Sequence, residues 1–231
     1  MQRQIFHFEI KTRISFKKAK KILENSKLRL KEIQSYVVAN CVHICQNKWD
    51  THFDTELPLK FIWAILYSNR ANRKAKQLQF KLLYNIVYTE ERLQRMGLSL
   101  NGSCHFCKEK ETLLHLFVHC KFVDSVWIEV FDKFSDFFLR KFNILAEKSV
   151  KNIGLGIFNK NLKKIAKFVN TILLSTKYFI WKERNVVKYQ KKAMSKFRII
   201  NLLKNELSFR SAIYDDDTFI ELKNSFCTRV Y

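Results

Sequence analysis

The chain has 231 residues, of which 47% are hydrophobic and 14% aromatic, so it can bury one sizeable core or two small ones and should be folded. Its 43 lysines and arginines against 21 acidic residues give a net charge of +22, which attracts polyanions such as the phosphate backbone of nucleic acids. No apolar run reaches the roughly 20 residues needed to cross a bilayer, and the N-terminus is charged where a secretory signal would be apolar, so we expect an intracellular protein that does not engage a membrane.

Glycine and proline are scarce, with four copies and one copy respectively. Tight hairpin turns depend on these residues, so the composition favours helices and predicts an all-α fold. Six cysteines in a long, lysine-rich chain do not resemble a disulfide scaffold, and three of them stand at metal-ligand spacing. We therefore expect reduced thiols.

Residues 1–46 are predicted to form a basic helical segment. Bases outnumber acids from Arg3 to Ile33, and apolar residues between Phe16 and Leu23 fall at helical spacing, which indicates an amphipathic helix whose basic face is either functional or merely solvated. A second, apolar helix is expected from Ile33 to Trp49. Its residues Cys41, His43 and Cys45 could suggest a second metal site. Only Cys41 and Cys45 share a helix face, so core packing explains the three residues better.

A helix with two distinct faces is expected between Lys60 and Gly97. Its apolar positions recur with a helical period at Leu78, Leu82, Leu83, Ile86 and Val87. If this helix is continuous, four bases project from the opposite side as a cationic stripe that can contact phosphates: Arg70, Arg73, Lys74 and Lys81.

A short helix should then deliver the chain to a group of cysteines. Thr89 is placed to cap this helix, and its first turn carries two acids, where the helix dipole favours negative charge. Gly97 is placed to end it.

The pattern Cys-x2-Cys-x7-His-x4-Cys follows. Its three thiolates and one imidazole, from Cys104, Cys107, His115 and Cys120, can close a tetrahedral shell around zinc. A tight turn after Gly102 would point the first two sulfurs at one ion, and Thr112 can cap the helix that carries His115. Structural zinc sites of this kind stabilise small folds.

Alternatives stay open for this cluster. In a continuous helix, Cys120 lies about 140° around from His115, so the helix must end or tighten near His119 for both side chains to reach one ion. His119, four residues after His115, is the competing fourth ligand, and His105 is a further candidate. A group of buried cysteines without metal is the remaining interpretation.

Further helices are expected after the cysteines. Val126 to Phe142 is rich in aromatic residues, which we interpret as core packing, with base stacking as the alternative. Gly154 and Gly156 mark a break, and Leu162 to Ile180 trace the buried stripe of a long helix. The basic stretch beyond it supplies three more candidate contacts to nucleic acid: Lys188, Lys191 and Lys192.

Two parts of the sequence, Leu78–Gly97 and Cys104–Trp127, together resemble the reverse-transcriptase zinc-binding domain. That domain lies at the C-terminal end of the polyproteins of LINE-type, non-LTR retrotransposons. The segment Ile172–Arg184, with its Ile-Trp-Lys-Glu-Arg ending, is similar to the helical tail that follows the domain in many such elements. The resemblance covers roughly Trp49 to Lys188.

The resemblance implies an accessory role, in which the module helps a polymerase domain located upstream to hold its RNA template or target DNA. The sequence departs from the family at His105 and Lys121, where proline is frequent. Neither departure removes a ligand, although Lys121 leaves the turn at Cys120 less rigid.

Two enzymatic interpretations are disfavoured. Tyr214-Asp215-Asp216-Asp217 mimics a polymerase active-site signature, but the further metal-binding aspartate and the strands of a palm domain are not recognisable upstream. A restriction-like endonuclease, which follows a similar knuckle in some elements, needs clustered carboxylates usually introduced by a Pro-Asp pair. Pro58 is the last proline in the chain, so we expect no enzymatic activity.

The sequence therefore predicts a helical bundle built around one small Cys-Cys-His-Cys zinc knuckle. Residues 1–46 form a basic N-terminal segment, 47–150 the zinc-binding domain and 151–231 a basic helical C-terminal segment. The predicted function is binding of RNA or DNA, largely independent of sequence, in the nucleus or the cytoplasm. The alternative is a structural or protein-interaction module, a truncated retrotransposon relic without its own affinity for nucleic acid.

Overall fold

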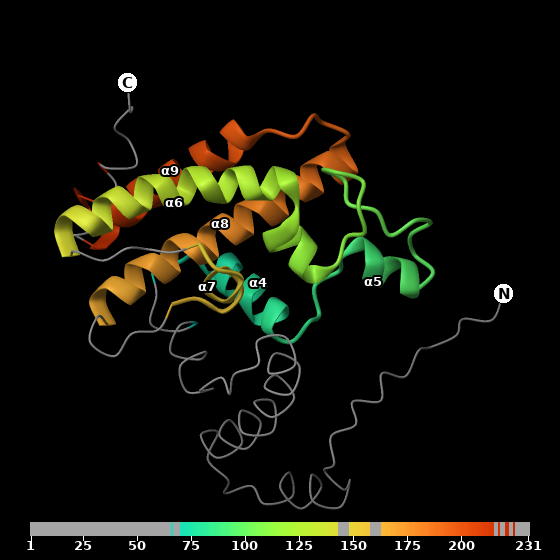
Figure 1. Ribbon diagram of the computed structural model, residues 1–231, viewed down its shortest axis with the longest axis horizontal. Coiled ribbons are helices and arrows are strands. Elements are labelled where there is room, and N and C mark those ends of the chain that lie inside the picture. The colour runs from blue at the N-terminus through green and yellow to red at the C-terminus, as the bar shows by residue number, and fades with distance from the viewer. Residues whose placement is uncertain are drawn as a thin grey trace, which may run out of the picture. The chain divides into compact units, whose positions relative to one another are not determined.

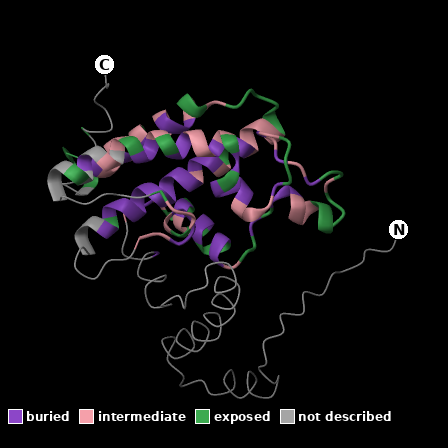
Figure 2. Ribbon diagram, in the orientation of Figure 1, coloured by how far each residue is buried: buried purple, intermediate pink, exposed green. Residues whose placement is uncertain are grey.

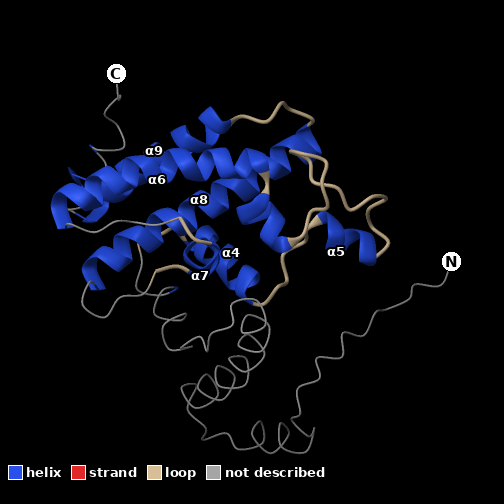
Figure 3. Ribbon diagram, in the orientation of Figure 1, coloured by secondary structure: helices blue, strands red, loops and turns tan. Residues whose placement is uncertain are grey.

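The computed structural model describes Leu66, residues 70–142, 148–157 and 163–214, and four single positions near the C-terminus, 217, 220, 221 and 224. Contacts divide the chain after Glu56, and all described residues belong to the unit that begins at Leu57. The predictions made for residues 1–46 lie outside the described residues. Within the described part every regular element is a helix (Figure 3), and a single bridge joins Ser103 to Lys110, which confirms the all-α class.

The described elements follow one another as α4 (Arg73–Leu83), α5 (Glu90–Arg95), the π-helical turn η1 (His115–His119), α6 (Lys121–Phe142), α7 (Val150–Leu155), α8 (Lys163–Gln190) and α9 (Lys196–Tyr214). Helix α8 packs against both α4 and α9, and α9 also packs against α6 (Figure 1). The η1 turn contacts α6 and α7. None of the described helices combines the length and hydropathy of a membrane span.

Helix α4 is shorter than the apolar pattern predicts. The Asn72 side chain accepts a hydrogen bond from the backbone of Ala75 at 2.8 Å and starts the helix, while Asn85, with a φ of 52°, follows its end. The expectation of one continuous helix through Val87 is therefore wrong, because the left-handed backbone at Asn85 turns the chain away. Val87 is still buried, but from a loop.

The long stripe predicted from Leu162 to Ile180 is confirmed for its described part within α8, while Leu162 and the side chain of Ile165 lie outside what the structure describes. Ile172, Leu173 and Ile180 are buried, and Figure 2 shows the middle of α8 coloured mainly as buried. Helix α9 contributes a matching face through Ile199, Leu203 and Leu207. Both helices fall after residue 151. Because α8 packs against α4 and α9 packs against α6, this described part of the C-terminal segment shares one core with the zinc-binding region.

The break predicted at two glycines is confirmed at one of them. Gly156, with a φ of 100°, ends α7, whereas Gly154 lies inside that helix. Aromatic residues of α6 are buried as core, as predicted: Trp127, Phe131 and Phe137.

A buried carboxylate shapes the turn between α8 and α9. Glu183 accepts a hydrogen bond from the backbone of Ser195 at 2.8 Å and pairs with Arg198 at 2.9 Å. Lys191 takes a φ of 54° directly after α8. The Ser195 hydroxyl then caps α9 by accepting from the backbone of Arg198 at 3.2 Å. These contacts return the chain onto α8.

Lys177 of α8 is completely buried without a carboxylate among its hydrogen-bond partners. Its ammonium donates to the side-chain oxygen of Gln79 on α4, and to the carbonyls of Ile153 at 2.7 Å and Gly154 at 3.3 Å on α7. Gln79 also donates to the Gly154 carbonyl at 2.9 Å. Three helices therefore meet at one lysine, and burial lowers the pKa of Lys177 to about 7.

We predict that Lys177 makes the stability of the folded chain depend on pH in the alkaline range. In the unfolded chain a lysine keeps its proton to about pH 10.4, so between about pH 7 and 10 the unfolded state binds more protons than the folded state. The free energy of unfolding should then rise with pH, by roughly 1 kcal/mol per pH unit. The free-energy cost of burying the protonated Lys177 side chain should be fully present below about pH 7. Chemical denaturation of wild type and Lys177→Met across this range checks it. The same pH slope in both proteins would contradict the assignment.

Candidate metal centre

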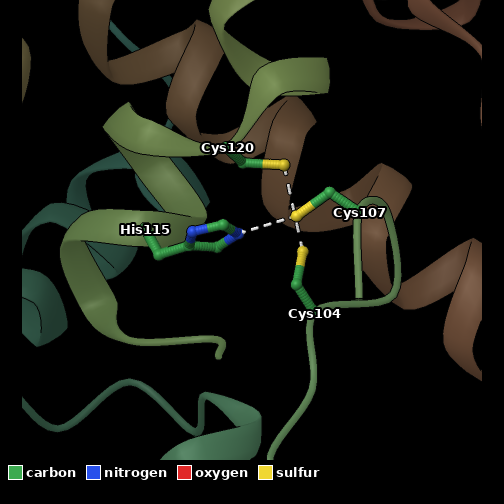
Figure 4. Close-up of side chains that lie close together, drawn as sticks. All are labelled: Cys104, Cys107, His115 and Cys120. Carbon is green, nitrogen blue, oxygen red and sulfur yellow. Dashed lines mark hydrogen bonds between the residues drawn. The ribbon is translucent and has the colours of Figure 1, made fainter. Parts of the chain in front are cut away.

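Four side chains predicted as metal ligands converge on one point (Figure 4). The ligand atoms of Cys104, Cys107, His115 and Cys120 all lie within 4.8 Å of one another. The sulfurs of Cys104 and Cys120 are 3.9 Å apart, and the Cys107 sulfur is 3.1 Å from Nε2 of His115. Ligands about 2.0 to 2.3 Å from a central ion at tetrahedral angles stand roughly 3.3 to 3.8 Å apart, so these two pairs lie near the spacing of a tetrahedral zinc shell.

The first two sulfurs are positioned by a tight turn. Gly102, with a φ of 60°, and Lys108, with a φ of 68°, take left-handed backbone conformations at its two ends. The backbone of Cys104 donates to the Glu109 carbonyl at 2.6 Å, and that of Lys108 donates to the Cys104 carbonyl at 3.0 Å. The backbone of Phe106 also donates to the Cys104 sulfur at 3.4 Å, which orients that sulfur inward.

The other two side chains of the cluster, those of His115 and Cys120, are brought together by the π-helical turn. Thr112 caps the segment as predicted, accepting at its hydroxyl from the backbone of His115 at 3.0 Å. The backbone of Cys120 then donates to the His115 carbonyl at 2.9 Å, a bond that spans five residues. A bond of this kind places Cys120 close to one full turn from His115, on the same face. The helix therefore ends at Cys120, which is one of the two outcomes that the sequence allowed. The other outcome was a tighter last turn, but the observed turn is π-helical and therefore wider than an α-helix.

The two competing histidines lie outside the cluster. His119 is exposed, and His105 instead bonds through Nε2 to a carboxylate oxygen of Glu90 at 3.1 Å. Among the described residues, the structure thus brings together the three cysteines and His115 predicted from the sequence.

The environment of the cluster suits a cation. Nδ1 of His115 lies 3.6 Å from a Glu109 carboxylate oxygen, the partner that commonly orients a metal-bound imidazole. Burial lowers the pKa of His115, which favours the neutral, ligating form. The hydrogen bond to Cys120, together with burial, raises the pKa of Cys104. A bound cation would take the place of the thiol protons and stabilise both thiolates.

Helix α6 supports the cluster from behind. Trp127 is fully buried, and its indole donates to the Phe117 carbonyl at 2.8 Å. Carbonyls near the end of a helix lack intrahelical partners, so this bond satisfies one that the interruption of the helix at Cys120 exposes. The rings of Phe106 and Phe122 pack with centroids 4.5 Å apart and join the cysteine turn to the start of α6.

A buried charge cluster ties the knuckle to α8. The Arg184 side chain is 1% exposed and that of Glu111, four residues before His115, is 0% exposed. Nη2 of Arg184 lies 2.7 Å from Oε1 of Glu111 and 2.6 Å from Oε1 of Glu90, the first residue of α5. Oε1 of Glu111 also accepts from the backbone of Glu90 at 2.8 Å. One guanidinium therefore joins α5, the knuckle and α8.

Glu90 is ionised in this cluster. Burial alone would raise its pKa, but hydrogen bonds from Lys188, Ser99 and His105 and the charge of Arg184 lower the pKa to about 2. Sequence reasoning placed Glu90 only as a favourable acid in a helix first turn and assigned no role to Glu111 or Arg184. The available signal was the position of Arg184 four residues after Ile180, on the buried face of the predicted helix, where a charge needs buried partners.

The predicted phosphate contacts divide into two groups. Arg73, Lys74 and Lys81 are exposed on α4, and Lys191 and Lys192 are exposed after α8. Arg70 precedes α4 and does not belong to its stripe, because its guanidinium lies 5.4 Å from the centre of the Phe168 ring. Lys188 is turned inward and pairs with Glu90.

These features define an all-helical module organised around a compact knuckle with three cysteines and one histidine. Residues 43–127 match the family described as zinc-binding in reverse transcriptase. The match confirms, for this part of the chain, the resemblance predicted from the sequence, while an origin in LINE-type elements stays a prediction. No curated protein and no solved structure matches the chain.

We predict that Arg184 is among the most stabilising side chains of the described region. Its removal in Arg184→Ala leaves two buried carboxylates without their shared cation, which should lower the free energy of unfolding by about 3 to 5 kcal/mol. Lys110→Ala is the matched control, because Lys110 forms an exposed pair with Glu91 at 3.0 Å and should contribute at most about 1 kcal/mol. Denaturant unfolding measures both. Similar losses in the two variants would contradict the assignment.

Proposed function

We propose that the chain binds one zinc ion through Cys104, Cys107, His115 and Cys120, and that this ion is structural. Four protein ligands fill a tetrahedral shell and leave no open position for a substrate or a reactive water. Soft thiolates favour zinc over hard cations such as magnesium. The family matched by residues 43–127 supports the same metal.

The zinc proposal predicts one zinc per chain in elemental analysis. Cys104→Ser and Cys120→Ser should lose the metal, and a chelator should unfold the knuckle, because metal binding contributes folding free energy. His119→Gln and His105→Gln are the controls and should retain the metal. A correctly folded wild type without zinc, or a His119→Gln variant as deficient as Cys120→Ser, would overturn the proposal.

We further infer that the chain is a non-catalytic nucleic-acid-binding module of a LINE-type reverse transcriptase. The observation that carries this inference is the exposed basic face of α4, formed by Arg73, Lys74 and Lys81, in a segment that matches a reverse-transcriptase family. A net charge of +22 supplies a long-range attraction for phosphates. The match is to a zinc-binding domain, which supports an accessory role beside a polymerase domain.

Binding to nucleic acid should be weakened steeply by salt, because phosphate contacts release counterions. Replacing Arg73, Lys74 and Lys81 together by glutamine should reduce the slope of log K against log salt by roughly 2 to 3. A control with equal charge removed from other exposed positions, Lys121, Lys167 and Lys182, should change the slope less. Absence of binding at low salt would instead favour the structural or protein-interaction module.

A further inference from the structure

A groove lies between α4 and α8, on the side of α4 that carries its exposed lysines. It has a volume of about 270 Å³ and is lined chiefly by Lys74, Leu78, Lys81, Tyr88, Tyr178 and Trp181. This volume is near the lower end of the roughly 300 to 1,000 Å³ typical of small-ligand pockets, so it suits one flat group better than a large ligand.

We propose that this groove, called here the α4–α8 groove, binds one unpaired nucleotide of a single-stranded nucleic acid, with its base against the aromatic side chains and its phosphates at the two lysines. The proposal deepens the nucleic-acid binding inferred above and rests on it. It names single strands, in preference to duplexes, as the class of ligand.

The chemistry of the lining favours a base with attached phosphates. Lys74 and Lys81 are exposed and two helical turns apart on one face of α4, about 10 Å along its axis. They can therefore hold the phosphates on either side of one nucleotide. The floor between them is apolar, since Leu78 and Val87 are buried. Cationic rims over aromatic and apolar walls are typical of single-strand binding sites.

The aromatic walls are held in place by neighbouring contacts. Tyr178 packs against the core cluster of Ala71, Ala75 and Leu174. The Arg184 guanidinium lies 5.1 Å from the centre of the Trp181 ring, so the buried charge cluster also orients this wall. A pre-positioned wall loses little side-chain freedom when a base stacks on it.

Tyr88 is the most exposed aromatic side chain among those that line this groove. It is 53% exposed, although large aromatic side chains of this size normally bury their rings. Its ring has Arg92 5.9 Å from its centre, which adds a cation beside the stacking surface. In a duplex the faces of the bases are already stacked, so a base can reach Tyr88 only from a single strand.

The test uses the full zinc-loaded chain with a short labelled oligouridine and a duplex RNA of matched length. Wild type should prefer the single strand. Tyr88→Ala should weaken single-strand binding by about 5- to 150-fold, which corresponds to one stacked base, and leave duplex binding nearly unchanged. Tyr88→Phe keeps the ring and should retain the affinity.

The matched control is Phe209→Ala. Phe209 is a similarly exposed ring, at 58%, with Arg210 at 5.5 Å from its centre, but it lies on α9 and does not line the groove. Phe209→Ala should leave the affinities for single-stranded and duplex RNA unchanged. For the lysines, Lys81→Gln should lower the single-strand salt slope by about 0.7, whereas Lys167→Gln should not.

A direct readout is the fluorescence of Trp181, taken as the difference between wild type and Trp181→Phe. Oligouridine should quench this signal. Equal effects of Tyr88→Ala and Phe209→Ala, equal losses for duplex and single strand, or an unquenched Trp181 would overturn the groove assignment while leaving general binding intact. Wild type that binds neither RNA at low salt would overturn the proposed function itself, and the groove assignment with it.

Discussion

The guanidinium of Arg184 provides the contact on which the arrangement of the described helices depends. It is buried between Glu90 and Glu111, and these two residues frame the segment that contains the cysteine turn. A buried cation without partners would be costly, so the paired geometry specifies how α8 sits against α5 and the knuckle. The same residue stacks on Trp181, which links the buried charges to the wall of the α4–α8 groove.

The candidate metal centre is built by local backbone geometry on both of its sides. Left-handed residues at Gly102 and Lys108 close the turn that holds two cysteines, and a π-helical turn carries His115 and Cys120 on one face. Neither segment has an extended core of its own. The bond from Trp127 to the Phe117 carbonyl and the Arg184 contacts attach the cluster to larger helices. A structural ion would complete a unit already supported from two directions.

Local signals in the sequence predicted much of this structure. Caps at Thr89 and Thr112, the stop at Gly97, the buried stripe of α8 and the four converging side chains each depend on residues close in sequence or on a repeating period, which physical rules connect directly to backbone conformation. The expectations that failed were those that extended a pattern too far. Helix α4 ends at Leu83, so Ile86 of the predicted stripe is exposed and Val87 is buried from a loop. Arg70 packs on Phe168 instead of joining the basic face.

By itself the sequence determined the helical class, the ligand types and their spacing, and the excess of positive charge, because these follow from composition and short-range periodicity. Only the tertiary structure decided which bases are exposed and which are paired. Lys188 looked equivalent to Lys191 and Lys192, yet it turns toward Glu90, which is distant in sequence. The buried partners of Arg184 and Lys177, and the meeting of α4 lysines with α8 aromatics in one groove, are likewise contacts between remote segments. Such contacts carry no local pattern, since they arise only when packing brings the helices together.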